Sequence, residues 1–307
     1  MTRETKAELS ALLPEGRVSF DEPMAAHCAM GVGGPAEAFA VTEDVEELKK
    51  LVAWSMERGV DYRFWGGGSN TLVRDGGLRG LAVKLGSGFD FMRVDRESGD
   101  EVFVSAGSAA DTRKFVEWCA GEGFSGVEVL AGCWGTVGGN LFTNAGAGGS
   151  SISDIVEEIT VVDREGRELS MKRSALRFEY RALKLPRTMA VVRALFKFRK
   201  SGADVVKADV AERMSKREET QPVGARSLGC VFKNPEKPPA GVLIEEAGLK
   251  GVRIGGARVS SLHANFIINE GKATARDVVV LMNLVRERVK EHTGVVLEPE
   301  IEVVGEE

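Results

Sequence analysis

Three consecutive glycines, Gly66 to Gly68, stand between two apolar segments and are followed by Ser69 and Asn70. Glycine has no side chain to pack, so such a run indicates a backbone that takes positive φ values and closely approaches a bulky group. Successive N–H groups in such a turn form a concave site for anions, most often phosphate. A flexible surface loop is the alternative, although residues 62–65 and 71–73 on either side have the character of packed structure. We therefore expect this loop to hold the pyrophosphate of a dinucleotide.

A second glycine-rich stretch covers residues 131–149 and contains the sequence Gly135-Thr136-Val137-Gly138-Gly139. Two such stretches indicate one extended ligand held from two sides, because a small phosphate would need only one. A glycine-rich connector is the alternative interpretation.

Three further segments carry polar residues that packing does not explain, around Arg181, Cys230 and Glu300. The planar guanidinium of Arg181 can hold a carboxylate or a phosphate through paired hydrogen bonds. A thiol near a cation can donate a proton near neutral pH, because the reference pKa of cysteine is about 8.5. A carboxylate on a buried strand is costly without a partner, which favours a functional or paired role for Glu298 and Glu300. Taken singly, a surface arginine, a core cysteine and an edge-strand glutamate are equally acceptable interpretations.

The bulk composition is that of a soluble globular protein with more than one domain. Of 307 residues, 43% are hydrophobic and 28% are charged. The net charge of −5 argues against a nucleic-acid partner, and no apolar run is long enough to span a membrane. The four cysteines form no Cys-x-x-Cys pair, and the three histidines lie far apart. We therefore expect a cytoplasmic protein with no disulfide framework and no metal site.

Hydrophobic periodicity predicts that mixed helices and strands position the glycine run. Thr42 is expected to cap a helix that Gly59 ends, and Asp111 to cap another. Strands are expected at residues 37–41, 62–65, 81–85, 102–106 and 192–198. The sequence Gly31-x-Gly33-x-x-Ala36 matches a Rossmann fingerprint, but Pro35 and a following strand replace the helix which that fingerprint requires. We therefore interpret it as a tight entry into a strand.

The C-terminal third begins with a charged helix expected over residues 204–219. The last helix is expected to start at Thr274, where Asp277 gives a capping-box spacing, and to stop before Gly294. Residues 295–301 are expected to form a final strand.

Together these motifs resemble the UDP-N-acetylenolpyruvoylglucosamine reductase (MurB) family. The Gly66–Asn70 run with Leu72-Val73 is similar to the family's first flavin loop. Residues 135–139 with Asn144-Ala145-Gly146 are similar to the second. Tyr180-Arg181, residues 229–235 and residues 297–300 resemble its three catalytic segments, and residues 244–266 resemble its shorter second subtype. The resemblance runs from His27 to Glu300, and the order of several motifs makes it specific.

This resemblance implies an α+β fold, with a flavin domain of the vanillyl-alcohol-oxidase (PCMH) type in two subdomains plus an α/β substrate lobe. The implied ranges are 1–86 and 87–200 for the two FAD subdomains, 201–294 for the substrate-binding lobe, and 295–307 for a strand that returns to the active site. The implied activity is the NADPH-dependent, FAD-mediated reduction of enolpyruvyl-UDP-N-acetylglucosamine to UDP-N-acetylmuramate in peptidoglycan precursor synthesis. FAD would be bound non-covalently, the only partner would be the UDP-sugar, and we expect a monomer.

The resemblance also assigns roles to particular residues. Arg181 and Glu300 would stabilise the enolate, and Cys230 would protonate the neighbouring carbon. Tyr180, Lys233 and Asn234 would bind substrate. The cofactor would be held by Gly66, Gly67, Gly68, Ser69, Asn70, Gly135, Thr136, Gly138, Gly139, Asn144 and Ala145.

The chain departs from the family pattern at several positions. Most members have serine in place of Cys230; the thiol is a stronger acid but is open to oxidation. Gly31 stands where relatives often have a basic residue, and Gly148 where a larger residue is common. Glu298 competes with Glu300 for the carboxylate role, and we favour Glu300 from its place in the motif.

Two other functions remain to be weighed. The chain could be another oxidase of the same flavin superfamily, in which His27 could carry a covalently attached flavin. It could also be a nucleotide-binding module without activity, against which the intact segments around Arg181, Cys230 and Glu300 argue.

Overall fold

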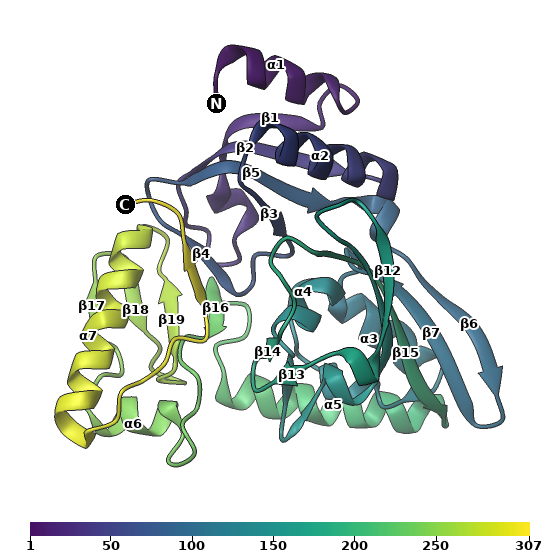
Figure 1. Ribbon diagram of the computed structural model, residues 1–307. Helices are drawn as coiled ribbons and strands as arrows, with labels where there is room; N and C mark the ends of the chain where they lie inside the picture. Colours follow the sequence, from purple (N-terminus) through teal and green to yellow (C-terminus); the bar gives the residue numbers. More distant parts are fainter. The chain divides into compact units, whose positions relative to one another are not determined.

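The computed structural model describes residues 1–307, and the chain divides into two compact units (Figure 1). The first unit consists of residues 1–20, 38–67 and 80–215. The second consists of residues 21–37, 68–79 and 216–307, so short segments from the first quarter of the chain are packed with its last third. The division into ranges 1–86, 87–200, 201–294 and 295–307 stays a prediction.

The N-terminal half of the first unit is a helix-covered sheet in the strand order β1-β2-β5-β3. Its elements are α1 (Arg3–Ala11), β1 (Val18–Pro23), β2 (Pro35–Thr42), α2 (Val45–Arg58), β3 (Tyr62–Trp65) and β5 (Leu78–Leu85). Leu48, Leu51 and Val52 of α2 are buried together with Ala38 and Ala40 of β2 in one hydrophobic cluster. The strands expected at 37–41, 62–65 and 81–85 are confirmed.

The N-cap of α2 is Asp44, so its expected position at Thr42 is wrong. The carboxylate of Asp44 accepts the N–H of Glu47 at 2.8 Å, whereas Thr42 is the buried last residue of β2. A chain that pairs as a strand up to Thr42 needs two more residues to turn into the helix. Gly59 ends α2 in the left-handed conformation, at φ 61°, as expected.

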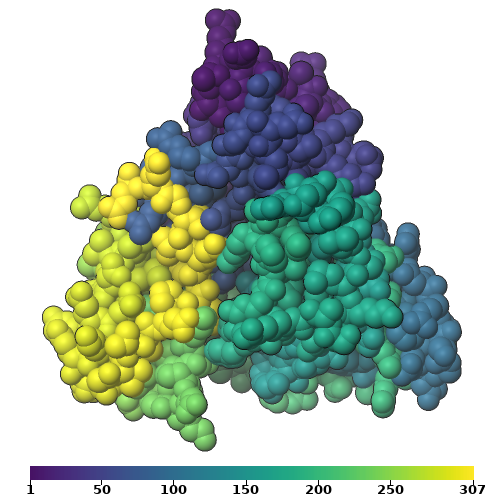
Figure 2. All heavy atoms as spheres, viewed as in Figure 1, coloured from purple at the N-terminus to yellow at the C-terminus, as the bar shows by residue number.

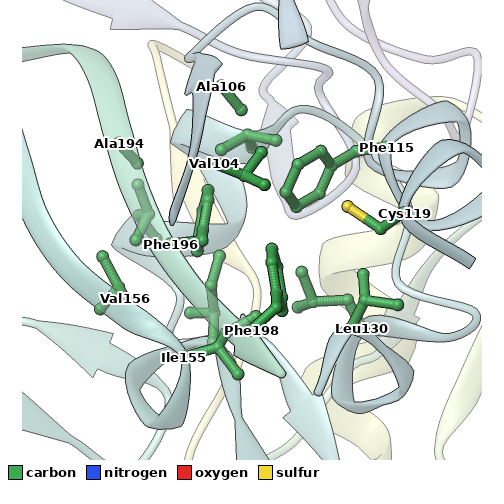
Figure 3. Close-up of a cluster of buried hydrophobic side chains, with 14 of the residues drawn as sticks. Val104, Ala106, Phe115, Cys119, Leu130, Ile155, Val156, Ala194, Phe196 and Phe198 are labelled. Atoms are coloured by element: carbon green, nitrogen blue, oxygen red, sulfur yellow. The ribbon is translucent and has the colours of Figure 1, made fainter. Parts of the chain in front are cut away.

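The other half of the first unit is an antiparallel sheet in the order β12-β11-β15-β7-β6, with β8 paired to β15. Its strands are β6 (Met92–Ser98), β7 (Glu101–Gly107), β8 (Phe124–Ser125), β11 (Val156–Val162), β12 (Glu168–Lys172) and β15 (Ala190–Lys200). Helices α3 (Thr112–Gly121) and α4 (Val137–Phe142) pack on it. Figure 3 shows Phe115 and Cys119 of α3 facing Phe196 and Phe198 of β15 in this core. Asp111 caps α3, as expected, by accepting the N–H of Lys114.

The second unit has a four-stranded sheet in the order β16-β19-β18-β17, covered by α7 (Figure 1). Its strands are β16 (Ser227–Cys230), β17 (Arg253–Ile254), β18 (Ala257–Val259) and β19 (Phe266–Asn269). The helices are α6 (Ala240–Glu246) and α7 (Ala275–Thr293). Helix α5 (Ala203–Thr220) matches the charged helix expected at 204–219, and its residues up to Ser215 belong to the first unit. Thr274 and Asp277 form the expected capping box of α7, and Gly294 ends the helix at φ 76°.

The strand expected over residues 295–301 is wrong. Only β20 (Glu302–Val304) is a strand in this region, and it pairs in parallel with β4 (Thr71–Val73). Pro299 has no N–H to donate to a ladder, so the segment before Glu302 forms only an isolated bridge with Phe232. In Figure 2, blue atoms from the early part of the chain lie among the yellow atoms of the C-terminal residues, as this pairing requires.

No helix of the structure is both long enough and apolar enough to cross a membrane.

Candidate active site

The two glycine stretches touch each other within the first unit. A Cβ on Gly67 would lie 2.8 Å from the Cα of Gly135, and one on Gly66 would lie 3.2 Å from Thr136 Oγ1. Only residues without side chains let the two backbones approach this closely, while Gly66 and Gly67 stay exposed on their other side. The glycines that the sequence places in separate stretches therefore form one continuous backbone surface.

The second stretch continues into α4, whose N-cap is Thr136. Thr136 Oγ1 accepts the N–H of Gly139 at 3.3 Å. Gly138 lies against the residue that follows β7: its N–H donates to Ser108 O at 2.9 Å, and a Cβ on it would lie 2.7 Å from Ser108 Cβ. One visible role of Gly138 is thus close packing of α4 on the sheet, and its contact with a cofactor stays a prediction.

The remainder of the first loop, Gly68 to Asn70, belongs to the second unit. Gly68 has φ 61°, and a Cβ there would lie 1.9 Å from His27 O, so no other residue fits. Gly68 O in turn accepts the N–H of Ala29 at 3.0 Å. The segment from His27 to Ala29 therefore packs against this loop. At the nearby Gly31, a Cβ would lie 3.6 Å from the Arg226 side chain. His27 Nε2 lies 2.9 Å from Glu22 Oε1.

Arg181 occupies the tip of a two-residue hairpin. The strands are β13 (Phe178–Glu179) and β14 (Ala182–Leu183), and Tyr180 and Arg181 form the turn between them. Arg181 has φ 58°, a left-handed conformation that a non-glycine residue adopts at an energetic cost and that is found mostly at functional positions. Its Nη1 donates to Gly146 O at 2.8 Å, and its guanidinium lies 5.6 Å from the centre of the Tyr180 ring.

Asn144 joins the second glycine stretch to this hairpin. Its Nδ2 donates to Glu179 O at 2.9 Å, and Asn144 itself takes φ 44°. Gly146, which accepts from Arg181, starts β9 (Gly146–Ala147), the partner of β10 (Ser150–Ser151). The predicted cofactor residue Asn144 and the predicted catalytic residue Arg181 are therefore brought together, with two hydrogen bonds between their segments.

Cys230 is placed by a bulge at the end of β16. Ser227 pairs with Ile268 and Cys230 with Phe266, so β16 has one residue more than β19 between these pairs. Gly229 supplies the left-handed residue of the bulge, at φ 76°. Such bulges redirect the next side chain, and they are over-represented beside active sites. The Cys230 side chain is partly exposed and forms no disulfide.

Two of the other three thiols lie in the core. Burial raises the pKa of the Cys28 and Cys119 thiols, and none of the four cysteines is in a disulfide. A thiol kept protonated inside a core is chemically inert, which applies to Cys28 and Cys119. Cys133, like Cys230, is only partly buried. No group of three or more histidine, cysteine or acidic residues is arranged to hold a metal ion.

The segment with Glu300 is hydrogen-bonded alongside the segment with Cys230. Glu300 N donates to Val231 O, and Lys233 N donates to Glu298 O, both at 2.8 Å. The Lys233 ammonium forms an ion pair with the Glu298 carboxylate. The carboxylate of Glu298 is therefore already paired with Lys233. This pairing favours Glu300 over Glu298 for the carboxylate role, which stays a prediction. Asn234 Oδ1 accepts the N–H of Ala240 at the start of α6.

The predicted site residues thus fall into two sets, each assembled inside one unit. In the first unit, the two glycine stretches contact each other through Gly66, Gly67, Gly135, Thr136 and Gly139. Hydrogen bonds also connect the Asn144–Gly146 segment with the hairpin that carries Arg181. The second unit joins Asn70, Cys230, Lys233, Asn234 and Glu300 through their paired segments. Two features were not predicted from the sequence: the bulge at Gly229 and the hydrogen bond from Asn70 to Glu300. A glycine directly before Cys230 is the sequence feature that could have indicated the bulge.

A dinucleotide such as FAD fits the set in the first unit. Buried Asn144 Oδ1 has no hydrogen-bond partner in the protein, which leaves one acceptor beside the glycine backbone for a ligand donor. The exposed backbone of Gly66 and Gly67 offers the surface that a pyrophosphate requires.

Comparison with known proteins agrees with this fit. Residues 36–172 match the sequence model of an FAD binding domain, and residues 221–304 match that of the UDP-N-acetylenolpyruvoylglucosamine reductase C-terminal domain. The UDP-N-acetylenolpyruvoylglucosamine reductase of Geobacter metallireducens is 42% identical over 100% of both chains. That of Halalkalibacterium halodurans is 36% identical over 99% of both.

Solved structures give the same result. The crystal structure of the MurB enzyme from Thermus caldophilus matches with a TM-score of 0.80 at 33% identity, covering 93% of this chain and 97% of that one. The 6-hydroxy-D-nicotine oxidase from Arthrobacter nicotinovorans, with a TM-score of 0.59 at 12% identity over 93% of this chain and 87% of that one, shares the fold alone. The expected fold class is confirmed, whereas the subtype stays a prediction. The chain therefore belongs to the UDP-N-acetylenolpyruvoylglucosamine reductase family of FAD-dependent oxidoreductases.

Proposed function

We propose that this protein reduces enolpyruvyl-UDP-N-acetylglucosamine to UDP-N-acetylmuramate with NADPH, as a step of peptidoglycan precursor synthesis. The observation that carries the proposal is the paired arrangement of the Cys230 and Glu300 segments in a chain 42% identical along its whole length to a reductase of this name. A proton donor and a carboxylate on neighbouring, hydrogen-bonded segments are the groups needed to finish the reduction of an enol ether.

A bound FAD would supply the hydride, taken from NADPH, that reduces the vinyl group of the substrate. The residues of this chain then do three things. Arg181 binds the substrate carboxylate and neutralises the negative charge that develops on the enolate, since a charge fixed before the reaction stabilises the transition state most. Cys230 gives its proton to the neighbouring carbon as a general acid. Glu300 orients the enolate, while Tyr180, Lys233 and Asn234 bind the rest of the substrate.

The cofactor is held without a covalent bond in this proposal. The ring of His27, the residue that could carry such a bond, is within hydrogen-bond distance of Glu22. Acid denaturation separates the two cases, because flavin in the supernatant means no covalent link. We further propose that the protein acts as a monomer in the cytoplasm, and size-exclusion chromatography with light scattering tests the first point.

The test of the function is an anaerobic absorption trace of the purified holoprotein. NADPH is added first and should bleach the yellow flavin, and enolpyruvyl-UDP-N-acetylglucosamine is then added and should restore the colour. If only oxygen restores it, the protein is an oxidase of the same superfamily and the proposed substrate is wrong. If no flavin is present and none binds, the glycine stretches do not form a flavin site.

A further inference from the structure

Asn70, which ends the first glycine loop, makes two hydrogen bonds to the C-terminal segment. Its side-chain Nδ2 donates to Glu300 O at 3.2 Å, and its backbone O accepts the N–H of Glu302 at 2.9 Å. Asn70 is therefore bonded to the backbone on both sides of Ile301. All of these residues belong to the second unit.

The side chain of Asn70 takes the place of a missing strand contact. The parallel pairing of β20 with β4 begins at Glu302 and Thr71, and it does not extend back to Glu300. In a regular parallel ladder, the carbonyl of Glu300 would be satisfied by a backbone N–H. Here the carboxamide of Asn70 supplies that donor, reaching one residue beyond the end of the ladder.

Glu300 is consequently fixed from both edges. On one edge its N–H donates to Val231 O, next to Cys230, and on the other its carbonyl accepts from Asn70. Pro299 has no N–H to donate, and Ile301 lies outside the strand, so regular strand pairing does not hold this part of the segment. Removing the amide takes this donor away from the Glu300 carbonyl and loosens one edge of the segment.

We infer that Asn70 is a positioning residue for Glu300. Its carboxamide holds the backbone of the catalytic carboxylate, while its neighbours Gly66 to Gly68 serve the cofactor. Enzymes need such groups held closely, since a misplacement of about 1 Å can cost on the order of a hundredfold in rate. The inference rests on the proposed function for the role of Glu300.

The experiment compares Asn70→Ala with the wild type in two half-reactions, measured by stopped flow with saturating FAD. Reduction of the flavin by NADPH is expected to stay within about twofold, because it does not involve Glu300. Reoxidation by enolpyruvyl-UDP-N-acetylglucosamine is expected to slow by roughly tenfold, within the range set by such misplacement. Hydrogen exchange on the apoprotein gives a second readout: the amides of residues 298–304 should exchange faster in the variant.

Arg79→Ala is the matched control. Arg79 forms an ion pair with Glu306 at 2.8 Å, so its removal loosens the same C-terminal segment beyond Glu302 without touching Glu300. In Arg79→Ala we expect faster hydrogen exchange only at the amides of the last residues, and the rates of both half-reactions should match those of the wild type. If Asn70→Ala does not fold, Asn70→Asp removes the same donor at constant shape and is measured in the same way.

Two results would overturn the inference. In the first, the Asn70 variant binds FAD more weakly and loses both half-reactions equally, which makes Asn70 a cofactor contact only. In the second, its exchange and both rates match the wild type. Failure of the proposed function is a separate outcome, seen when substrate does not reoxidise the wild-type flavin, and the hydrogen-exchange readout still tests the hold on Glu300 in that case.

Discussion

Cys230 owes its position to the residue before it. Gly229 takes φ 76° in the bulge of β16, and the additional residue there changes the direction of the next side chain. The result is a partly exposed thiol in a protein whose Cys28 and Cys119 are buried and inert. A thiol is a stronger acid than a serine hydroxyl, and either group can act as a proton donor at this place.

Substitution of Cys230 separates proton donation from the other steps. Cys230→Ser should remain active, whereas Cys230→Ala should lose turnover and still let NADPH bleach the flavin, because only the protonation needs this side chain. Steady-state turnover and anaerobic bleaching measure the two effects. Full turnover by the alanine variant would remove Cys230 from the mechanism.

At the scale of elements, the hairpin of β13 and β14 stores backbone strain at its tip. Arg181 takes a left-handed conformation there and is held by Gly146, while Asn144 holds Glu179 at the end of β13. The second glycine stretch therefore fixes the orientation of the hairpin that carries the guanidinium.

Two variants of Arg181 measure the strain. Arg181→Ala and Arg181→Gly both lose the guanidinium, but only glycine takes a positive φ without steric cost. We expect the alanine variant to be less stable by about 1 kcal/mol, and both variants to lose substrate-dependent turnover. Urea unfolding measures the difference. Equal stabilities would mean that the turn relaxes and that no strain is stored at this position.

The contact between the glycine stretches leads to a prediction about cofactor content. Gly67→Ala places a Cβ 2.8 Å from Gly135 Cα, so the two backbones must separate, which opens the surface proposed to hold the flavin. We expect the purified variant to carry much less FAD, measured as the ratio of flavin absorbance at about 450 nm to protein.

Gly121→Ala is the control for this substitution. Gly121 lies at the end of α3 with no atom within 4 Å of the place that a Cβ would take, and its φ is not in the left-handed region. It should keep its FAD and gain up to about 1 kcal/mol of stability, because alanine restricts the unfolded chain. Normal FAD content in the Gly67 variant would show that the stretches tolerate separation.

At the scale of the whole molecule, segments far apart in the sequence complete each other's structure. The carboxylate of Asp75 accepts the N–H groups of Ala275 and Arg276, each at 2.9 Å, and so satisfies the start of α7 from the first quarter of the chain. The pairing of β4 with β20 works in the same way. Residues 216–307 alone would therefore lack the cap of α7 and the partner strand of β20.

The stability of the second unit should depend on pH through His263. Burial lowers the pKa of His263, and its Nδ1 accepts the N–H of Asn265 at 3.2 Å, which requires that nitrogen to be unprotonated. The unfolded chain takes up a proton near the ordinary histidine pKa of about 6.5, and the folded protein resists it. The free energy of unfolding should thus fall as the pH drops below that value.

His263→Asn removes this titration and keeps a side-chain acceptor for the N–H of Asn265. Urea midpoints of both proteins at about pH 7.5 and about pH 5.5, roughly one unit on either side of the ordinary histidine pKa, give the comparison. The wild type should lose more stability than the variant between them. An equal loss in the two proteins would assign the pH dependence to other groups.

Local chemistry determined much of the result from the sequence alone. Several confirmed predictions depend only on neighbouring residues: the capping box at Thr274, the cap at Asp111, the helix stops at Gly59 and Gly294, and the strand at 62–65 before the first glycine run. The family motifs are also local in sequence, which is why the fold class and the FAD domain could be predicted.

Only the tertiary structure decided what depends on distant partners. It moved the last strand from 295–301 to Glu302–Val304, because the pairing with β4 starts at Glu302 and Pro299 has no N–H to donate to a ladder. It brought Gly67 against Gly135 and Asn70 onto Glu300, contacts for which hydrophobic periodicity gives no signal. Sequence patterns report how a residue relates to its neighbours along the chain, whereas the geometry of a site is set by hydrogen bonds between segments far apart in the sequence.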